Sequence, residues 1–166
     1  ANGTTFVDKL TVGASCSTEG ATIYYTKDGA EPTTGSDKFP TEGVTLTETT
    51  TLKAIAVKDG LDNSEVVTAT YTKLEPYASL KALKESSIAT EEGKPCVVEL
   101  KDAVVTYADS RKAYIQDETA GLYVFGSNKL KAGTKLNGVV AAQLALYFGL
   151  YELKVDGGEF DNVAVT

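Results

Sequence analysis

Hydrophobic and polar positions alternate with a period of two through residues 113–126, interrupted by the polar run 117–121. This pattern predicts two antiparallel strands joined by a turn. One face of the predicted hairpin carries Ile115, Leu122 and Val124, and the opposite face carries Tyr114, Tyr123 and Phe125. The aromatic face is either the bed of a second core layer or an open surface that binds a ligand.

Short β-rich runs and turn signals alternate through the first 72 residues, at the spacing typical of a β-sandwich. The expected strands cover residues 10–16, 22–26, 44–46, 51–58 and 65–72. In the last of these, we expect Val67, Ala69 and Tyr71 to face the core and the intervening threonines to face water.

The pattern becomes helical after residue 73. Leu80, Leu83 and Lys84 have the spacing of one helix face, and Ser79 is a candidate N-cap. Residues 73–95 are therefore expected to form a linker and a short helix within residues 77–87. This helix either plugs the end of a barrel or lies against the first domain.

Residues 96–166 return to β-structure. A long strand over residues 96–107 changes phase near Lys101 and Asp102, which indicates a β-bulge, and strands over 137–147 and 151–155 follow the hairpin. Five strands of which the first is long and bent predict an OB-fold barrel. The predicted fold class is all-β, with an immunoglobulin/fibronectin-III-like β-sandwich at residues 1–72 followed by a five-stranded OB-fold barrel at residues 96–166.

Three motifs in the first half carry a resemblance to a known family. ATIYYTKDGAEPT at 21–33, TLKAIAVKDG at 51–60 and VTATY at 67–71 resemble the chitobiase/β-hexosaminidase C-terminal-type domain. That family is a fibronectin-III-like sandwich found beside catalytic domains in secreted bacterial enzymes. The resemblance implies an accessory role rather than a reaction.

Motifs in the second half resemble the OB-fold domains of secreted Bacteroidetes proteins, chiefly YIQD at 114–117, AGLYVF at 120–125 and LKAG at 130–133. Related domains precede extracellular nuclease-type catalytic domains. The two resemblances together imply a secreted or cell-envelope protein, which is extracellular, periplasmic or attached to the outer membrane as a lipoprotein.

Composition excludes several classes of function. The formal net charge of −7 argues against a protein that grips duplex DNA, although the part after residue 72 is nearly balanced, with 11 basic and 13 acidic residues. The absence of His removes Ser-His-Asp and Cys-His catalysis and any His-ligated metal. No apolar stretch approaches the length of a membrane span. Because the sequence contains no Met, we expect the start and any targeting segment to lie outside it.

The two cysteines, Cys16 and Cys96, fall on predicted strands of separate domains. A disulfide needs Cα atoms within roughly 7 Å, so we expect no bond between them and two small buried hydrophobic side chains instead.

The candidate ligand-binding residues are the aromatic face of the hairpin and the basic residues near it. They are Tyr107, Tyr114, Tyr123, Phe125, Arg111, Lys112 and Lys129, with Lys131 and Lys135 as further members of a basic rim. The alternative is that these lysines form no binding rim and are only solvated at the ends of the strands. The acidic loops 59–63 and 156–161 lack the spacing of a calcium-binding loop, so we interpret them as turns and expect neither metal nor cofactor.

The sequence therefore predicts a monomeric, non-catalytic protein that binds carbohydrate or a protein partner at the cell surface. The alternative is a single-stranded nucleic-acid-binding module that serves an extracellular nuclease, and a third possibility is a spacer. Salt dependence separates the first two, since nucleic-acid affinity falls steeply with salt.

Overall fold

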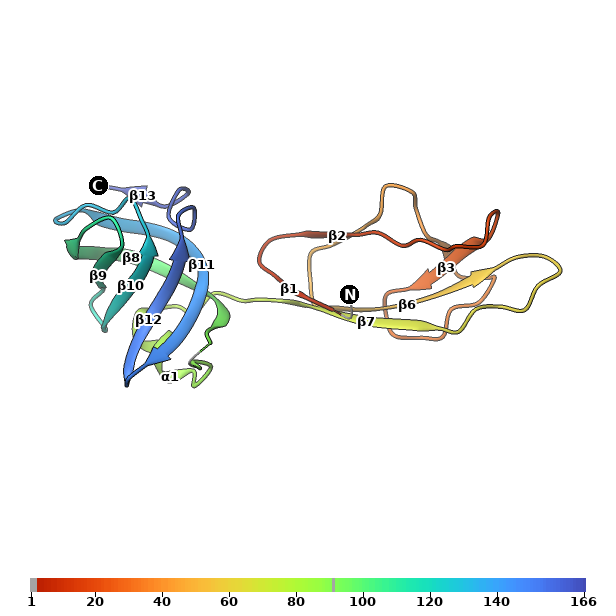
Figure 1. Ribbon diagram of the computed structural model, residues 1–166, viewed down its shortest axis with the longest axis horizontal. Coiled ribbons are helices and arrows are strands. Elements are labelled where there is room, and N and C mark those ends of the chain that lie inside the picture. Colours follow the sequence, from red (N-terminus) through yellow and green to blue (C-terminus); the bar gives the residue numbers. More distant parts are fainter. Residues whose placement is uncertain (1–2, 91) are drawn as a thin grey trace. The chain divides into compact units, whose positions relative to one another are not determined.

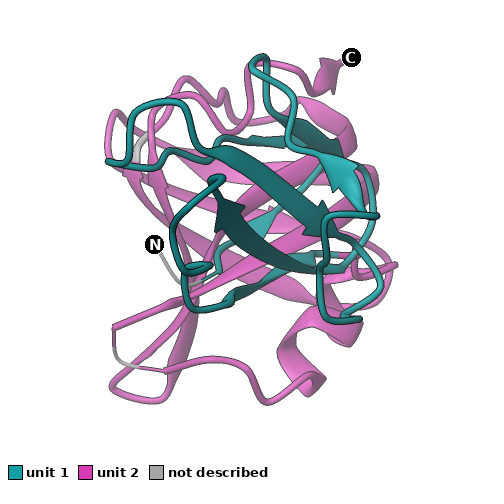
Figure 2. Ribbon diagram, turned by 90° about the vertical axis from the view of Figure 1, so that its right-hand side faces the viewer, with its two compact units in different colours: residues 1–74 teal, residues 75–166 magenta. Residues whose placement is uncertain are grey.

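The computed structural model describes residues 3–90 and 92–166, and in this part of the chain it is all-β apart from one six-residue helix (Figure 1). It divides into two compact units, residues 1–74 and residues 75–166 (Figure 2). Each unit has its own cluster of buried hydrophobic side chains.

The first unit contains two sheets. The larger has the strand order β1-β7-β6-β3-β4, and the smaller pairs β2 with β5. Phe6, Val44, Leu46 and Leu52 are buried and form the core. The strands are β1 (Thr5–Phe6), β2 (Leu10–Val12), β3 (Thr22–Thr26), β4 (Asp37–Lys38), β5 (Val44–Leu46), β6 (Thr50–Val57) and β7 (Val67–Lys73).

Two expectations for this unit are wrong. The strand expected over residues 10–16 ends at Val12, because its partner β5 begins at Val44, and Cys16 is consequently exposed in the following loop. Val67 is exposed rather than buried. The small sheet has strands of only three residues and cannot cover the whole length of the larger sheet.

The second unit is built around a closed barrel of five strands, as predicted. Strands β8 and β9, β9 and β10, β11 and β12, and β8 and β11 pair antiparallel, while β10 and β12 pair in parallel. The unpredicted β13 adds a short edge beside β11. The bounds are β8 (Lys94–Ala108), β9 (Lys112–Gln116), β10 (Gly121–Ser127), β11 (Lys135–Tyr147), β12 (Leu150–Asp156) and β13 (Ala164–Val165).

Two bulges bend β8. The predicted one lies at Lys101 and Asp102, where both side chains are exposed and Asp102 adopts a positive φ of 49°. The second was not predicted and lies at Thr106: β8 advances two residues from Val105 to Tyr107 while its partner β9 advances one. The extra residue turns the Tyr107 side chain from the core side to the outer face.

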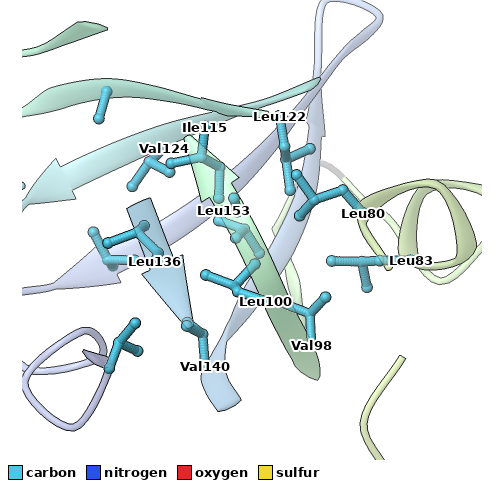
Figure 3. Close-up of a cluster of buried hydrophobic side chains, with 14 of the residues drawn as sticks. Leu80, Leu83, Val98, Leu100, Ile115, Leu122, Val124, Leu136, Val140 and Leu153 are labelled. Atoms are coloured by element: carbon cyan, nitrogen blue, oxygen red, sulfur yellow. The ribbon is translucent and has the colours of Figure 1, made fainter. Parts of the chain in front are cut away.

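The helix α1 (Leu80–Glu85) packs against the core of the barrel. Leu80 and Leu83 are fully buried in the cluster that contains Leu100, Ile115 and Leu153 (Figure 3). Ser79 caps the helix as predicted, since its side chain accepts a hydrogen bond from the backbone N–H of Ala82. The barrel is therefore the correct choice between the two placements that the sequence left open.

Both thiols are free, as expected. Cys96 is buried on β8, and this burial raises the pKa of its thiol to about 11. Among the described residues, no helix is long and apolar enough to cross a membrane.

Candidate ligand-binding surface

Four aromatic side chains lie side by side on the outer face of the barrel, across strands β8, β9 and β10. We call Tyr107, Tyr114, Tyr123 and Phe125 the aromatic row. Successive ring centroids are 6.2, 5.0 and 6.2 Å apart. Tyr107 is 48% exposed, Tyr114 46% and Phe125 37%, so the row offers ring surface to solvent.

The alternation of the hairpin positions these rings. Ala113, Ile115, Leu122 and Val124 point into the core and are buried, which leaves their neighbours on the outer face. Strand pairing then aligns the rings, because Tyr114 is the cross-strand partner of both Tyr107 and Tyr123. The helix contributes its leucines to the core instead of covering the row, so the aromatic face is not a bed for α1.

Charged side chains gather at the ends of the row. The Arg111 guanidinium lies 5.7 Å from the centroid of the Phe125 ring, in a cation–π arrangement, and Lys112 is the cross-strand partner of Phe125. At the other end, the Tyr107 hydroxyl donates a hydrogen bond of 3.0 Å to Asp109. Arg111 and Lys112 therefore lie beside the rings of the row.

Asp109 organises the turn between β8 and β9. Its Oδ1 accepts hydrogen bonds from the backbone N–H groups of Arg111 and Lys112, at 2.8 and 2.7 Å. The first of these bonds is the main cause that lowers the pKa of the Asp109 carboxyl. The same carboxylate raises the pKa of Tyr107 through the hydrogen bond to its hydroxyl. Asp109 thus fixes the ring of Tyr107 and brings a negative charge to the row.

Lys129 does not join this group. Its ammonium pairs with Asp161 at 3.1 Å, and both line a separate cavity of about 320 Å³ together with Leu130, Phe160 and Val163. Lys131 lines the same cavity, and Lys135 lies 3.9 Å from the Asp102 carboxylate. The expected basic rim is therefore reduced to Arg111 and Lys112 at the row itself.

A depression of about 270 Å³ adjoins the row on the side of α1. Its lining includes Tyr114 and Tyr123 of the row as well as Leu150 and Tyr151 of β12. The Lys84 ammonium lies 5.7 Å from the centroid of the Tyr151 ring and reaches into the same space. The surface available to a ligand consequently extends beyond the four rings.

Sequence reasoning missed Glu152. This residue is the cross-strand partner of Tyr123 and occupies the outer face of β12, opposite to the inward-facing Leu153. Burial raises the pKa of the Tyr123 hydroxyl, with smaller contributions from Tyr114 and Glu152. Alternation along β12 alone could have placed Glu152 outside, but only the parallel pairing of β10 with β12 brings it to the row.

One of the two acidic loops, 156–161, is closed by its own carboxylate. In the loop 156–161, the Glu159 carboxylate accepts hydrogen bonds from the backbone N–H groups of Asp156, Gly157 and Gly158 and so closes the turn. Over residues 3–90 and 92–166, no group of three Cys, Asp or Glu side chains is placed to hold a metal ion.

Comparison with known proteins found one family match, in the first unit. Residues 1–68 match the family model of the chitobiase/beta-hexosaminidase C-terminal domain, which is a carbohydrate-associated accessory domain type without catalytic activity. The match covers most of the first unit and none of the barrel. The comparisons with curated proteins and with solved structures found no match.

Proposed function

We propose that the protein is a non-catalytic binding module that recognises carbohydrate through the aromatic row. The observation that carries this proposal is the line of four adjacent rings on one outer face, uncovered by α1. We further propose that the second unit is an OB-fold, whose strands 2 and 3 commonly bind oligonucleotides or oligosaccharides. Strands β9 and β10 hold these positions in the barrel.

The chemistry of the row suits a sugar. A pyranose ring has apolar C–H faces that pack on aromatic rings, and a rim of hydroxyl groups that need hydrogen-bonding partners. The row offers flat ring surface together with the Tyr107 hydroxyl, the Asp109 and Glu152 carboxylates and the Arg111 guanidinium. Few polar groups around an apolar surface are typical of ligand sites.

The charges favour carbohydrate over single-stranded nucleic acid. A nucleic-acid groove needs a positive track for the phosphates beside its stacking rings. Here Arg111 and Lys112 are the cations at the row. They are balanced by one carboxylate at Tyr107 and another beside Tyr123, while Lys129 pairs with Asp161. The carbohydrate-associated domain type of residues 1–68 supports the same choice and an extracellular or periplasmic location.

Replacement of Tyr123 by Ala tests the proposal. Tyr123 is central in the row and only partly buried, so we expect its removal to cost at most about 2 kcal/mol of unfolding free energy, less than a core aromatic. Loss of a central aromatic contact should weaken binding by about 2 kcal/mol, or roughly thirtyfold in Kd. The measurements are calorimetric titration with neutral hexasaccharides and urea denaturation.

Tyr24→Ala is the matched control, because it removes a half-buried tyrosine from β3 in the other unit. This variant should keep the affinity of the wild type. The proposal fails if Tyr123→Ala binds the sugars normally, or if it loses more than about 3 kcal/mol of stability as a core ring would. Tight binding of oligothymidylate that weakens steeply with salt would establish the nucleic-acid alternative instead.

A further inference from the structure

Glu152 is an almost fully buried carboxylate on the outer face of the barrel. Its side chain lies between two cross-strand partners, Tyr123 on β10 and Ala145 on β11. Only 5% of the residue is exposed, and Ala145 is buried as well. A carboxylate is rarely buried to this extent unless a partner compensates its charge.

No such partner is present in the part of the chain that the structure describes. None of the described groups donates a hydrogen bond to the Glu152 carboxylate, and no ion pair includes it. The same residues contain no side-chain oxygen that is both sealed from solvent and without a partner. The two oxygens of Glu152 therefore open narrowly to the surface with their acceptor sites free.

The neighbouring strands on both sides of this carboxylate carry aromatic side chains, of which Tyr123 is partly buried and Tyr147 is exposed. Tyr123 of the aromatic row is its cross-strand partner on one side. On the other side Tyr147 shares its face, because Tyr147 and Ala145 are two residues apart on β11. The rings of Tyr147 and Phe148 are in contact, with centroids 4.5 Å apart. Phe148 is 93% exposed at the turn between β11 and β12 and has a φ of 48°, a conformation that favours Gly or Asn. A large apolar side chain is thus held in a strained and solvated position at the turn of the hairpin whose second strand carries Glu152.

We infer that Glu152 is the specificity-determining residue of the site and selects uncharged sugars over anionic ones. Its two oxygens accept hydrogen bonds from neighbouring hydroxyl groups of a sugar that stacks on Tyr123. A ligand carboxylate or sulfate at the same place meets a like charge in a desolvated position. The inference rests on the proposed function and adds the chemical class of the ligand.

The test compares Glu152→Gln with the wild type, using cellohexaose, xylohexaose and chitohexaose as neutral probes and hexagalacturonate as the anionic probe. The wild type should bind at least one neutral probe more tightly than hexagalacturonate. Glu152→Gln should raise the Kd for that neutral probe by about fivefold or more, since hydrogen bonds to a charged group are lost. The affinity for hexagalacturonate should be unchanged or higher, so that the selectivity falls.

The melting temperature of Glu152→Gln provides a second readout. A purely structural role of Glu152 would lower it. Because no donor compensates the buried Glu152 carboxyl group, the amide should leave the melting temperature unchanged or raise it. Glu99→Gln is the matched control: Glu99 lies on β8 outside the row and pairs with Lys101 at 2.9 Å. This control should change neither the affinities nor their ratio.

Three results would overturn the inference. A lower melting temperature of Glu152→Gln with the neutral affinity within about twofold of the wild type would assign the residue a structural role. Equal affinity of the wild type for hexagalacturonate and for the neutral probes would show that the site does not select uncharged sugars. In both cases the proposed function stands if Tyr123→Ala loses binding. Failure of the wild type to bind any of the probes would reject the proposed function and this inference together.

Discussion

Asp117 ties the helix to the hairpin through one carboxylate. Its Oδ1 accepts hydrogen bonds from the backbone N–H and the hydroxyl of Thr119 and from the N–H of Ala120. Its Oδ2 accepts a bond of 2.8 Å from the N–H of Leu80, at the start of α1. Burial alone would raise the pKa of this carboxyl, but the bonds from Thr119, Leu80 and Ala120 outweigh burial and lower it.

The lowered pKa makes this stabilisation depend on pH. The folded-state pKa lies below the ordinary value of 3.8, so the contribution is complete above that pH and is lost as the pH falls through the folded-state pKa. At pH 7, Asp117→Asn should reduce the unfolding free energy by about 2 kcal/mol. The difference from the wild type should shrink below pH 3.8 in urea denaturation curves.

Glu118→Gln is the control for this measurement, since the neighbouring Glu118 is exposed. It should change stability by less than about 0.5 kcal/mol at either pH. A difference between Asp117→Asn and the wild type that stays constant down to pH 2 would contradict the role of the charge.

Single residues also show how far the candidate site could be predicted from the sequence. Tyr114, Tyr123 and Phe125 follow from a period of two within one hairpin, which is a local property. Tyr107 reaches the same face only because Thr106 is an extra residue in β8, and no signal in the sequence marks that bulge. Glu152 joins the row through pairing between strands that are distant along the chain.

At the scale of elements, the parallel pair of β10 and β12 closes the barrel. The two strands pair from Tyr123 with Glu152 to Ser127 with Asp156. Gly126 sits inside this pair with a φ of +126°, and a Cβ added there would lie 1.8 Å from the carbonyl oxygen of Val155. The close approach of the two backbones therefore requires glycine.

Gly126→Ala should destabilise the barrel by at least about 3 kcal/mol, because the strand must move and the new residue adopts a strained φ. Gly121→Ala, in the same strand, is the control: its added Cβ would meet nothing closer than 3.8 Å. Thermal melts followed by circular dichroism compare the two variants. Equal melting temperatures would refute the argument from backbone contact.

The positions of strands and of the helix could be predicted where the pattern of hydrophobic and polar residues is local. Residues 22–26 and 44–46 coincide with β3 and β5, and the phase change near Asp102 revealed a bulge. The two-residue strands β1, β4 and β13 are too short to leave a periodic signal. The exposure of Val67 depends on how far the opposite sheet extends, which no local pattern records.

At the scale of the whole molecule, the boundary between units lies between Leu74 and Glu75. The sequence suggested that the barrel begins at residue 96, with a linker and helix before it. In the structure, Leu80 and Leu83 belong to the barrel core, and Asp117 accepts a hydrogen bond from Leu80. The helix is consequently part of the second unit.

Two fragments test this boundary. Residues 75–166 alone should melt in a single cooperative transition, since the fragment keeps one complete core. Residues 96–166 lack two fully buried leucines, each worth about 2–5 kcal/mol, and should be unfolded or bind a hydrophobic dye. Equal stability of the two fragments would show that α1 is dispensable.

Closure by β12 also determines when this barrel can form on the ribosome. β12 is the last of the five barrel strands to be synthesised. Both β10 and β11 lack a pairing partner on one edge until β12 is present. Until Leu150 and the residues after it emerge, these two strands present open edges that can pair with other nascent chains. The first unit is complete at Leu74 and can fold much earlier. A ribosome paused before β12 therefore carries a folded first unit and an incomplete barrel whose unpaired strand edges favour aggregation.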